Sequence, residues 1–209
     1  MKNILLFGDS IRRGYDEAVK SSLAGIANVY FPEDNSRFAA YAFRYLREYK
    51  RLLNGAPCHL IHWNAGLWDC LRLFEDEPQT PIEIYTYYID RICQRLQKLF
   101  PEASVIFATS TSVQTEKMDK DLIRYNREIE AYNRAAIAVV EKYGFGVNDL
   151  YATSMTLPEE AHSDPVHYYT PMGTEVFANQ VLAVITKALG IDEPIVYKEE
   201  LYTDEPVGM

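Results

Sequence analysis

Short runs of apolar residues alternate with longer segments of helical periodicity along the first 190 residues. The first run, 4–7, is four apolar residues without interruption, as is typical of a strand buried on both faces of a parallel sheet. A segment with helical spacing follows over 11–24, and the same succession of strand and helix recurs four times. The further strands are predicted at 28–31, 58–63, 104–108 and 146–150, and the further helices at 36–53, 80–100, 120–143 and 170–189.

This alternation predicts a single-domain, three-layer α/β/α fold around a five-stranded parallel sheet. In the flavodoxin-like strand order 2-1-3-4-5, the chain reverses direction between the first and third strands. Ligands bind at that point, beyond the carboxyl ends of the strands. Ser10 and Asn64 follow these two strands, so both side chains are expected to border one crevice. We assign 1–190 to this domain and 191–209 to an acidic, proline-interrupted C-terminal tail.

Charge and composition narrow the possible partners. The chain has 30 acidic and 21 basic residues and a formal net charge of −9, which disfavours nucleic acids and anionic membranes as partners. No segment reaches transmembrane length, and the apolar run at 4–7 is too short for a signal-peptide core. Three cysteines without metal-ligand spacing favour a reducing compartment. We therefore expect a cytoplasmic protein that acts on a small molecule without membrane insertion, and its oligomeric state stays open.

Ser10 lies between a buried strand and the start of a helix. Backbone N–H groups are free at such a position, and the positive end of the helix lies beside them. The position therefore suits a nucleophile that must receive developing negative charge. It is also typical of an ordinary Asp-Ser helix cap, in which Asp9 and Ser10 only begin the helix.

A second candidate group lies in the long loop predicted at 151–169, since a compact domain usually keeps such a loop for function. Asp164 precedes His167 by three residues, and a turn of that length folds the carboxylate back onto Nδ1–H of the imidazole. The carboxylate then fixes the tautomer and leaves Nε2 to take a proton from a serine. The alternatives are a loop pair or a cap of the last helix. A metal site made of His162, Asp164 and His167 has no obvious further ligand pair.

The combination of these motifs resembles the SGNH or GDSL family of esterases and acylhydrolases. Gly8-Asp9-Ser10-Ile11 matches the family's first block, with Ile in place of the final Leu. Asp164-Pro165-Val166-His167 matches the last block, and the resemblance extends to about Leu189. It implies that Ser10 is the nucleophile, His167 the general base and then acid, and Asp164 the residue that orients His167. It implies no metal and no organic cofactor.

The second block departs from the family pattern. The family usually places a glycine there, whose N–H contributes to the oxyanion hole. The corresponding turn here is Asp34-Asn35-Ser36-Arg37 and contains no glycine. Any non-proline residue still has a backbone N–H, so we expect Asn35 or Ser36 to donate instead.

The third block, usually Gly-x-Asn-Asp, also departs. One alignment places Asn64 on the family's Asn, whereas a shift of two places Gly66 and Asp69 on its Gly and Asp and Trp68 where its Asn belongs. We prefer Asn64, because only an amide there reaches into the crevice and donates to an oxyanion. The alternative is an Asn that caps a strand end. The expected oxyanion hole is therefore the N–H of Ser10, an N–H near Asn35 and the side chain of Asn64.

We interpret the chain as a serine esterase that forms an acyl-enzyme on Ser10. Its substrate is an O-acetylated carbohydrate, a short-chain ester or a lysophospholipid. A catalytically silent ligand-binding module on the same fold is the main alternative. A phospho-acceptor role for Asp9 would need an acidic Mg²⁺ cluster, for which only Asp69 is available besides. Candidate substrate contacts are Asp9, Arg37, Gly66 and Trp68, and Trp63, Trp68, Tyr168 and Tyr169 form either an aromatic wall or part of the core.

Overall fold

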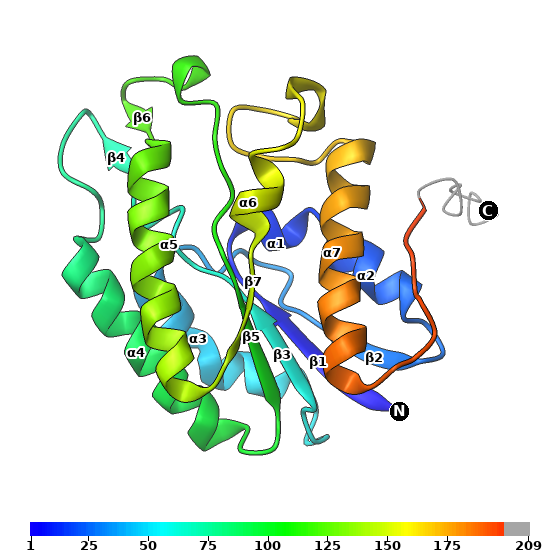
Figure 1. The fold of residues 1–209 in the computed structure, drawn as a ribbon. Coiled ribbons are helices and arrows are strands. Elements are labelled where there is room, and N and C mark those ends of the chain that lie inside the picture. The colour runs from blue at the N-terminus through cyan, green and yellow to red at the C-terminus, as the bar shows by residue number, and fades with distance from the viewer. Residues whose placement is uncertain (199–209) are drawn as a thin grey trace, which may run out of the picture.

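A five-stranded parallel sheet lies between two groups of helices in the computed structural model, which describes residues 1–198 (Figure 1). Helices α3, α4 and α5 cover one face of the sheet, and α2 and α7 cover the other. The helices are α1 (Ser10–Arg13), α2 (Asp16–Ser22), α3 (Ala39–Arg51), α4 (Ile82–Leu99), α5 (Asn126–Val140), α6 (Leu150–Ser154) and α7 (Pro171–Leu189). The strands of the sheet are β1 (Lys2–Phe7), β2 (Ala27–Tyr30), β3 (Leu60–Trp63), β5 (Ser104–Ala108) and β7 (Gly146–Asn148).

The sheet has the order β2-β1-β3-β5-β7 with every neighbouring pair parallel. Counted over these five strands, this is the predicted order 2-1-3-4-5, and the prediction is confirmed. Strands β1 and β3 are neighbours, with Phe7 in register with Trp63. The turns that follow these two strands therefore meet at the same edge of the sheet, where the chain changes direction.

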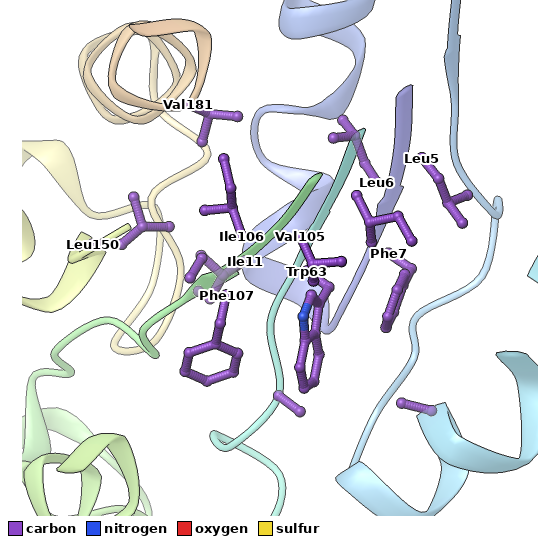
Figure 2. Packing of buried hydrophobic residues seen from close by; sticks show 14 of the residues in the cluster. Leu5, Leu6, Phe7, Ile11, Trp63, Val105, Ile106, Phe107, Leu150 and Val181 are labelled. Atoms are coloured by element: carbon purple, nitrogen blue, oxygen red, sulfur yellow. The ribbon is translucent and has the colours of Figure 1, made fainter. Parts of the chain in front are cut away.

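The last register row before this edge is aromatic. Phe7, Trp63 and Phe107 are in register across β1, β3 and β5, and Figure 2 shows their rings side by side on one face of the sheet. The Phe7 and Trp63 rings stack with centroids 5.5 Å apart, and the Trp63 and Phe107 centroids are 4.9 Å apart. All three side chains are fully buried. Of the two alternatives for Trp63, an aromatic wall or the core, the structure shows the core.

The neighbouring row faces α7 and includes a buried histidine, His62. Its Nε2 is 3.1 Å from Nδ2 of Asn148, and its ring packs edge-on against Tyr15. Burial lowers the pKa of His62 to about 3, so the ring is neutral at ordinary pH. It is therefore a packed core histidine.

Two predicted helices are shorter than their periodicity suggested. The helix expected at 11–24 is divided into α1 and α2, because the chain turns at Gly14 and buries Tyr15. The helix expected at 120–143 begins at Asn126. The residues before it form β6 (Leu122–Ile123), which pairs antiparallel with β4 (Arg72–Leu73) in a small separate sheet.

The remaining differences lie near the C-terminus. The loop predicted at 151–169 contains most of α6 and a 3₁₀ turn at Glu159–Ala161. Residues 199–209 of the predicted tail lie outside the described residues, so the boundary at 190 stays a prediction. Of the helices described, none combines the length and the apolar character needed to cross a membrane. Cys58, Cys70 and Cys93 are all buried free thiols.

Candidate active site

Ser10 and His167, which are 157 positions apart in the sequence, meet at the carboxyl edge of the sheet. Ser10 is the first residue of α1, and His167 lies in the loop before α7. The distance between Oγ of Ser10 and Nε2 of His167 is 2.8 Å. The spacing is that of a hydrogen bond through which a hydroxyl can pass its proton to an imidazole.

Asp164 holds the other side of the imidazole. Its Oδ2 is 2.7 Å from Nδ1 of His167, and its Oδ1 accepts the N–H groups of Val166 and His167 at 2.8 and 2.9 Å. Burial acts to raise the pKa of Asp164, but these donors outweigh it and lower that pKa below its ordinary value. An ionised carboxylate is therefore available to orient the ring and to stabilise its protonated form.

Tyr169 packs against the same pair. Its ring stacks on the His167 imidazole with centroids 4.8 Å apart, and its hydroxyl donates to the carbonyl oxygen of Ser10 at 2.6 Å. Tyr169 thus contacts both halves of the site. Tyr168, by contrast, is buried and its hydroxyl bonds to Ser112, so it anchors the loop of His167 to the segment that follows β5.

Asn64 and Asp9 form a buried pair beneath Ser10. The Asn64 amide donates to Oδ1 of Asp9 at 2.7 Å, and the same oxygen accepts the N–H of Ile11 at 3.0 Å. Asp9 is fully buried, and burial raises its pKa. Asp9 therefore does not contact a substrate, contrary to its selection as a candidate contact. It caps α1 and positions Asn64, whose amide keeps a second N–H for another acceptor.

Gly8 is required by the close approach of β1 to Asn64. A Cβ added at Gly8 would lie 1.8 Å from Oδ1 of Asn64, well inside van der Waals contact. Any other residue would push the amide out of place. The glycine of the first motif therefore has a packing reason that is tied to the candidate oxyanion donor.

The second turn does not supply the expected donor. The N–H of Asn35 is bonded to the side chain of Asp34 at 2.7 Å, and the N–H of Ser36 is bonded to the carbonyl oxygen of Gly8 at 2.8 Å. Both N–H groups that were candidates for the oxyanion hole are therefore already engaged. The bond from Ser36 to Gly8 fastens this turn to the end of β1, whereas the N–H of Asn35 is held at the surface by the exposed Asp34.

The other candidate contacts differ in their surroundings. Arg37 pairs with Asp34 at 3.3 Å and lies over the ring of Tyr41, away from the Ser10–His167 pair in every contact it makes. Gly66 has a φ of +148°, and a Cβ there would lie 2.5 Å from Oγ of Ser110. Trp68 is half-buried in the turn that follows. The structure does not bring these three residues into contact with Ser10.

Asp69, the Asp of the alternative alignment, is bonded to the start of α3. Both of its carboxylate oxygens accept the N–H of Ala39, at 3.0 and 3.2 Å, at the start of α3. Burial raises the pKa of Asp69 to about 7. This carboxyl group thus caps α3 at the point where the second turn ends. Within residues 1–198, no cluster of three or more His, Cys, Asp or Glu side chains is arranged to hold a metal ion.

Sequence reasoning missed Arg124. Only 5% of this residue is exposed, and its Nε donates to the carbonyl oxygen of Leu67. Burial lowers the pKa of Arg124, and the charges of Asp9 and Asp164 act on it in the opposite direction. The helical periodicity had placed Arg124 inside a helix. The residue instead follows β6, a two-residue strand too short to leave a signal in the sequence.

Comparison with solved structures identifies the fold. A lipase/acylhydrolase from Enterococcus faecalis superposes with a TM-score of 0.68 at 18% identity, covering 90% of this chain and 96% of that chain. The acetyl xylan esterase AlAXEase gives 0.69 at 15% identity, covering 88% and 99%. The psychrotrophic esterase EstA from Pseudoalteromonas sp., in a structure inhibited by monoethylphosphonate, gives 0.68 at 10% identity, covering 91% and 100%.

No protein-family model matches the chain, and no curated protein sequence matches it. The likeness is therefore one of architecture and extends over nearly the whole of both partners in each comparison. The chain has the three-layer fold of the SGNH/GDSL lipases, esterases and acylhydrolases, as the resemblance of its motifs predicted.

Proposed function

We propose that this protein is a serine ester hydrolase that forms an acyl-enzyme on Ser10. The observation that carries the proposal is the continuous chain of hydrogen bonds from Ser10 Oγ through both ring nitrogens of His167 to Asp164. Nucleophile, base and orienting acid within hydrogen-bond reach of one another are what covalent acyl transfer needs. The fold shared with known esterases supports this reading.

The first half of the reaction acylates Ser10. Its Oγ attacks the ester carbonyl while Nε2 of His167 takes the hydroxyl proton, and Asp164 stabilises the resulting imidazolium. The negative oxygen of the tetrahedral intermediate accepts hydrogen bonds from the N–H of Ser10 and from the second N–H of the Asn64 amide. His167 then returns its proton to the leaving alcohol, and the acyl group stays on Ser10.

The second half releases the acid. His167 takes a proton from water, the resulting hydroxide attacks the acyl carbonyl, and a second tetrahedral intermediate forms. Its collapse expels the Ser10 oxygen, which recovers the proton from His167. The products are one carboxylic acid and one alcohol.

A panel of para-nitrophenyl esters of increasing acyl length, run beside acetylated sugars, tests the activity and the substrate class together. We expect turnover on short acyl groups and its complete loss in Ser10→Ala. Ser21→Ala is the matched control, because it makes the same change on α2, where the hydroxyl bonds only to carbonyl oxygens of its own helix. Binding of these compounds without turnover would instead favour the silent binding module.

A further inference from the structure

We propose that Arg124 binds a carboxylate group carried by the ester substrate. This inference rests on the proposed function and narrows it from esters in general to anionic esters. It comes from a buried guanidinium whose outer donors have no partner and which lies beside the candidate active site.

The donors of Arg124 are only partly used. Its Nε bonds to the Leu67 carbonyl oxygen, but Nη1 and Nη2 form no hydrogen bond or ion pair with any residue in 1–198. The residue is 95% buried, yet neither terminal nitrogen is among the fully enclosed polar atoms that lack a partner. The two unpaired nitrogens therefore face a space that solvent enters. A buried cation left in this state costs free energy unless an anion pairs with it.

The position of the guanidinium is set from three sides. Leu67, which Arg124 holds, follows the turn that carries Asn64. The carbonyl oxygen of Arg124 accepts the hydroxyl of Thr115 at 2.9 Å, and β6 immediately precedes it. Gln114, the residue before Thr115, donates its N–H to the carbonyl oxygen of Pro165 at 2.8 Å, so the segment that holds Arg124 is bonded to the loop between Asp164 and His167. The charges of Asp9 and Asp164 also act on the guanidinium. The group is therefore anchored on the side of the crevice where the ester must lie.

Neither neighbouring acid pairs with the guanidinium of Arg124. Oδ1 of Asp9 already accepts the N–H of Ile11 and the amide of Asn64, and Oδ2 of Asp9 is fully enclosed and makes no hydrogen bond or ion pair with Arg124. Asp164 is committed to His167. The protein as a whole has a net charge of −9, so its general field repels anions. Arg12, two residues after Ser10, is also buried, but it pairs with Asp16, whereas Arg124 has no acidic partner among residues 1–198. Its two outer nitrogens match the two oxygens of a carboxylate in a bidentate pair.

Matched pairs of esters test the inference on either side of the scissile bond. On the acyl side, para-nitrophenyl hydrogen succinate is compared with its neutral isostere, para-nitrophenyl isocaproate, after subtraction of spontaneous hydrolysis. On the alcohol side, para-acetoxybenzoate is compared with phenyl acetate. We expect kcat/KM to favour the charged member of one pair by about tenfold or more, as one charge-assisted pair can provide.

Variants then assign the preference to Arg124. We expect Arg124→Gln to reduce the ratio of charged to neutral kcat/KM to about one, and Arg124→Lys to retain part of it. Arg127→Gln, which makes the same change in charge at an exposed position three residues on, should keep the ratio of the parent. Equal rates within both pairs in the parent would overturn the inference even if Arg124→Gln fails to fold. A preference that survives Arg124→Gln would overturn it as well.

A binding measurement separates this inference from the proposed function. The anilide of succinic acid is an amide that resists turnover, and its neutral counterpart is the anilide of isocaproic acid. We expect the charged anilide to raise the thermal midpoint of the parent and of Ser10→Ala, but not of Arg124→Gln. That pattern without any ester turnover would reject the hydrolase and keep the carboxylate site. Turnover of neutral and charged esters alike, without this shift in thermal midpoint, would keep the hydrolase and reject the carboxylate site.

Discussion

The two turns that border the crevice use their polar groups in opposite ways. On the side of Ser10, the side chains of Asp164 and His167 bond to each other. Asp164 accepts three hydrogen bonds, which hold the imidazole ring in place. On the other side, two backbone donors of the turn from Asp34 to Arg37 are already bonded, the N–H of Asn35 to the Asp34 side chain and the N–H of Ser36 to the carbonyl oxygen of Gly8. The first turn leads to a hydrogen-bonded group at Ser10, whereas the second fastens the start of α3 to the end of β1.

This difference indicates which hydrogen-bond donors are free to stabilise the oxyanion. A donor that already has a good partner in the folded state gains little by turning to a transient oxyanion. The oxyanion is therefore expected to depend on Ser10 and Asn64, with no contribution from the second turn. Substitutions on the two sides of the crevice are therefore expected to differ in their effects on kcat by orders of magnitude.

Removal of the base should have the largest effect. We expect His167→Ala to lower kcat on a para-nitrophenyl ester by about 10⁴-fold or more, because Ser10 then has no group to take its proton. The His167 side chain is partly exposed, so the thermal midpoint should stay that of the parent. Retained turnover at an unchanged midpoint would show that another residue is the base.

Removal of the Asn64 amide should have the second largest effect on kcat. Asn64→Ala is expected to lower kcat by about 10²–10³-fold with little change in KM, since the lost hydrogen bond exists only in the transition state. The variant also leaves Asp9 with one donor fewer, so thermal unfolding is measured beside the kinetics. An unchanged kcat would move the oxyanion donor elsewhere in the crevice.

The structural role of Asp69, which holds the start of α3 after the second turn, can be tested through the pH dependence of stability. Burial raises the pKa of Asp69 from 3.8 to about 7, against the effect of the Ala39 N–H. Between these values the unfolded chain releases the proton while the folded chain keeps it, so this group makes the fold less stable as pH rises. The amide of the Asp69→Asn variant does not titrate, so that variant lacks this dependence.

The free energy of unfolding of the parent minus that of Asp69→Asn should therefore fall from about pH 4 to about pH 7 and then level off. Urea denaturation at closely spaced pH values measures this difference. The opposite effect of buried His62 is common to both chains and cancels in the subtraction. A difference that is flat or rises with pH would mean that Asp69 is ionised in the folded state.

The smallest effect is expected at the second turn itself. Asp34→Ala frees the N–H of Asn35 and removes the pairing with Arg37, both outside the candidate site. We expect kcat to change by less than about threefold, as is usual for an exposed pair. A large gain in kcat would show that the released N–H joins the oxyanion hole, and a large loss would show that the turn already serves catalysis.

The sequence predicted what depends on short, local patterns. The apolar runs and their spacing predicted the five strands and their order, because buried parallel strands impose such runs. The three residues from Asp164 to His167 predicted a turn that a chain of this length closes without help from elsewhere. The meeting of Ser10 with His167 was expected from the resemblance of their two motifs to the SGNH/GDSL family, and the strand order predicted only that Ser10 and Asn64 share an edge.

Features that depend on distant partners could not be predicted. The N–H of Ser36 is engaged because the second turn meets Gly8, a contact that no property of the turn itself indicates. Arg124 leaves its expected helix because β6 pairs with β4 about 50 residues earlier in the chain. The burial of Asp9, which removes it from the substrate contacts, follows from the packing of Asn64 against Gly8.

Covalent labelling of Ser10 is the most direct test of the account. A fluorophosphonate that reacts with activated serines is added to the parent, Ser10→Ala and His167→Ala, and the intact mass and the modified peptide are measured. The account predicts one adduct per chain, located on Ser10, with none in Ser10→Ala and a greatly slowed reaction in His167→Ala. A parent chain that stays unlabelled while folded, or labelling that persists in Ser10→Ala, would contradict it.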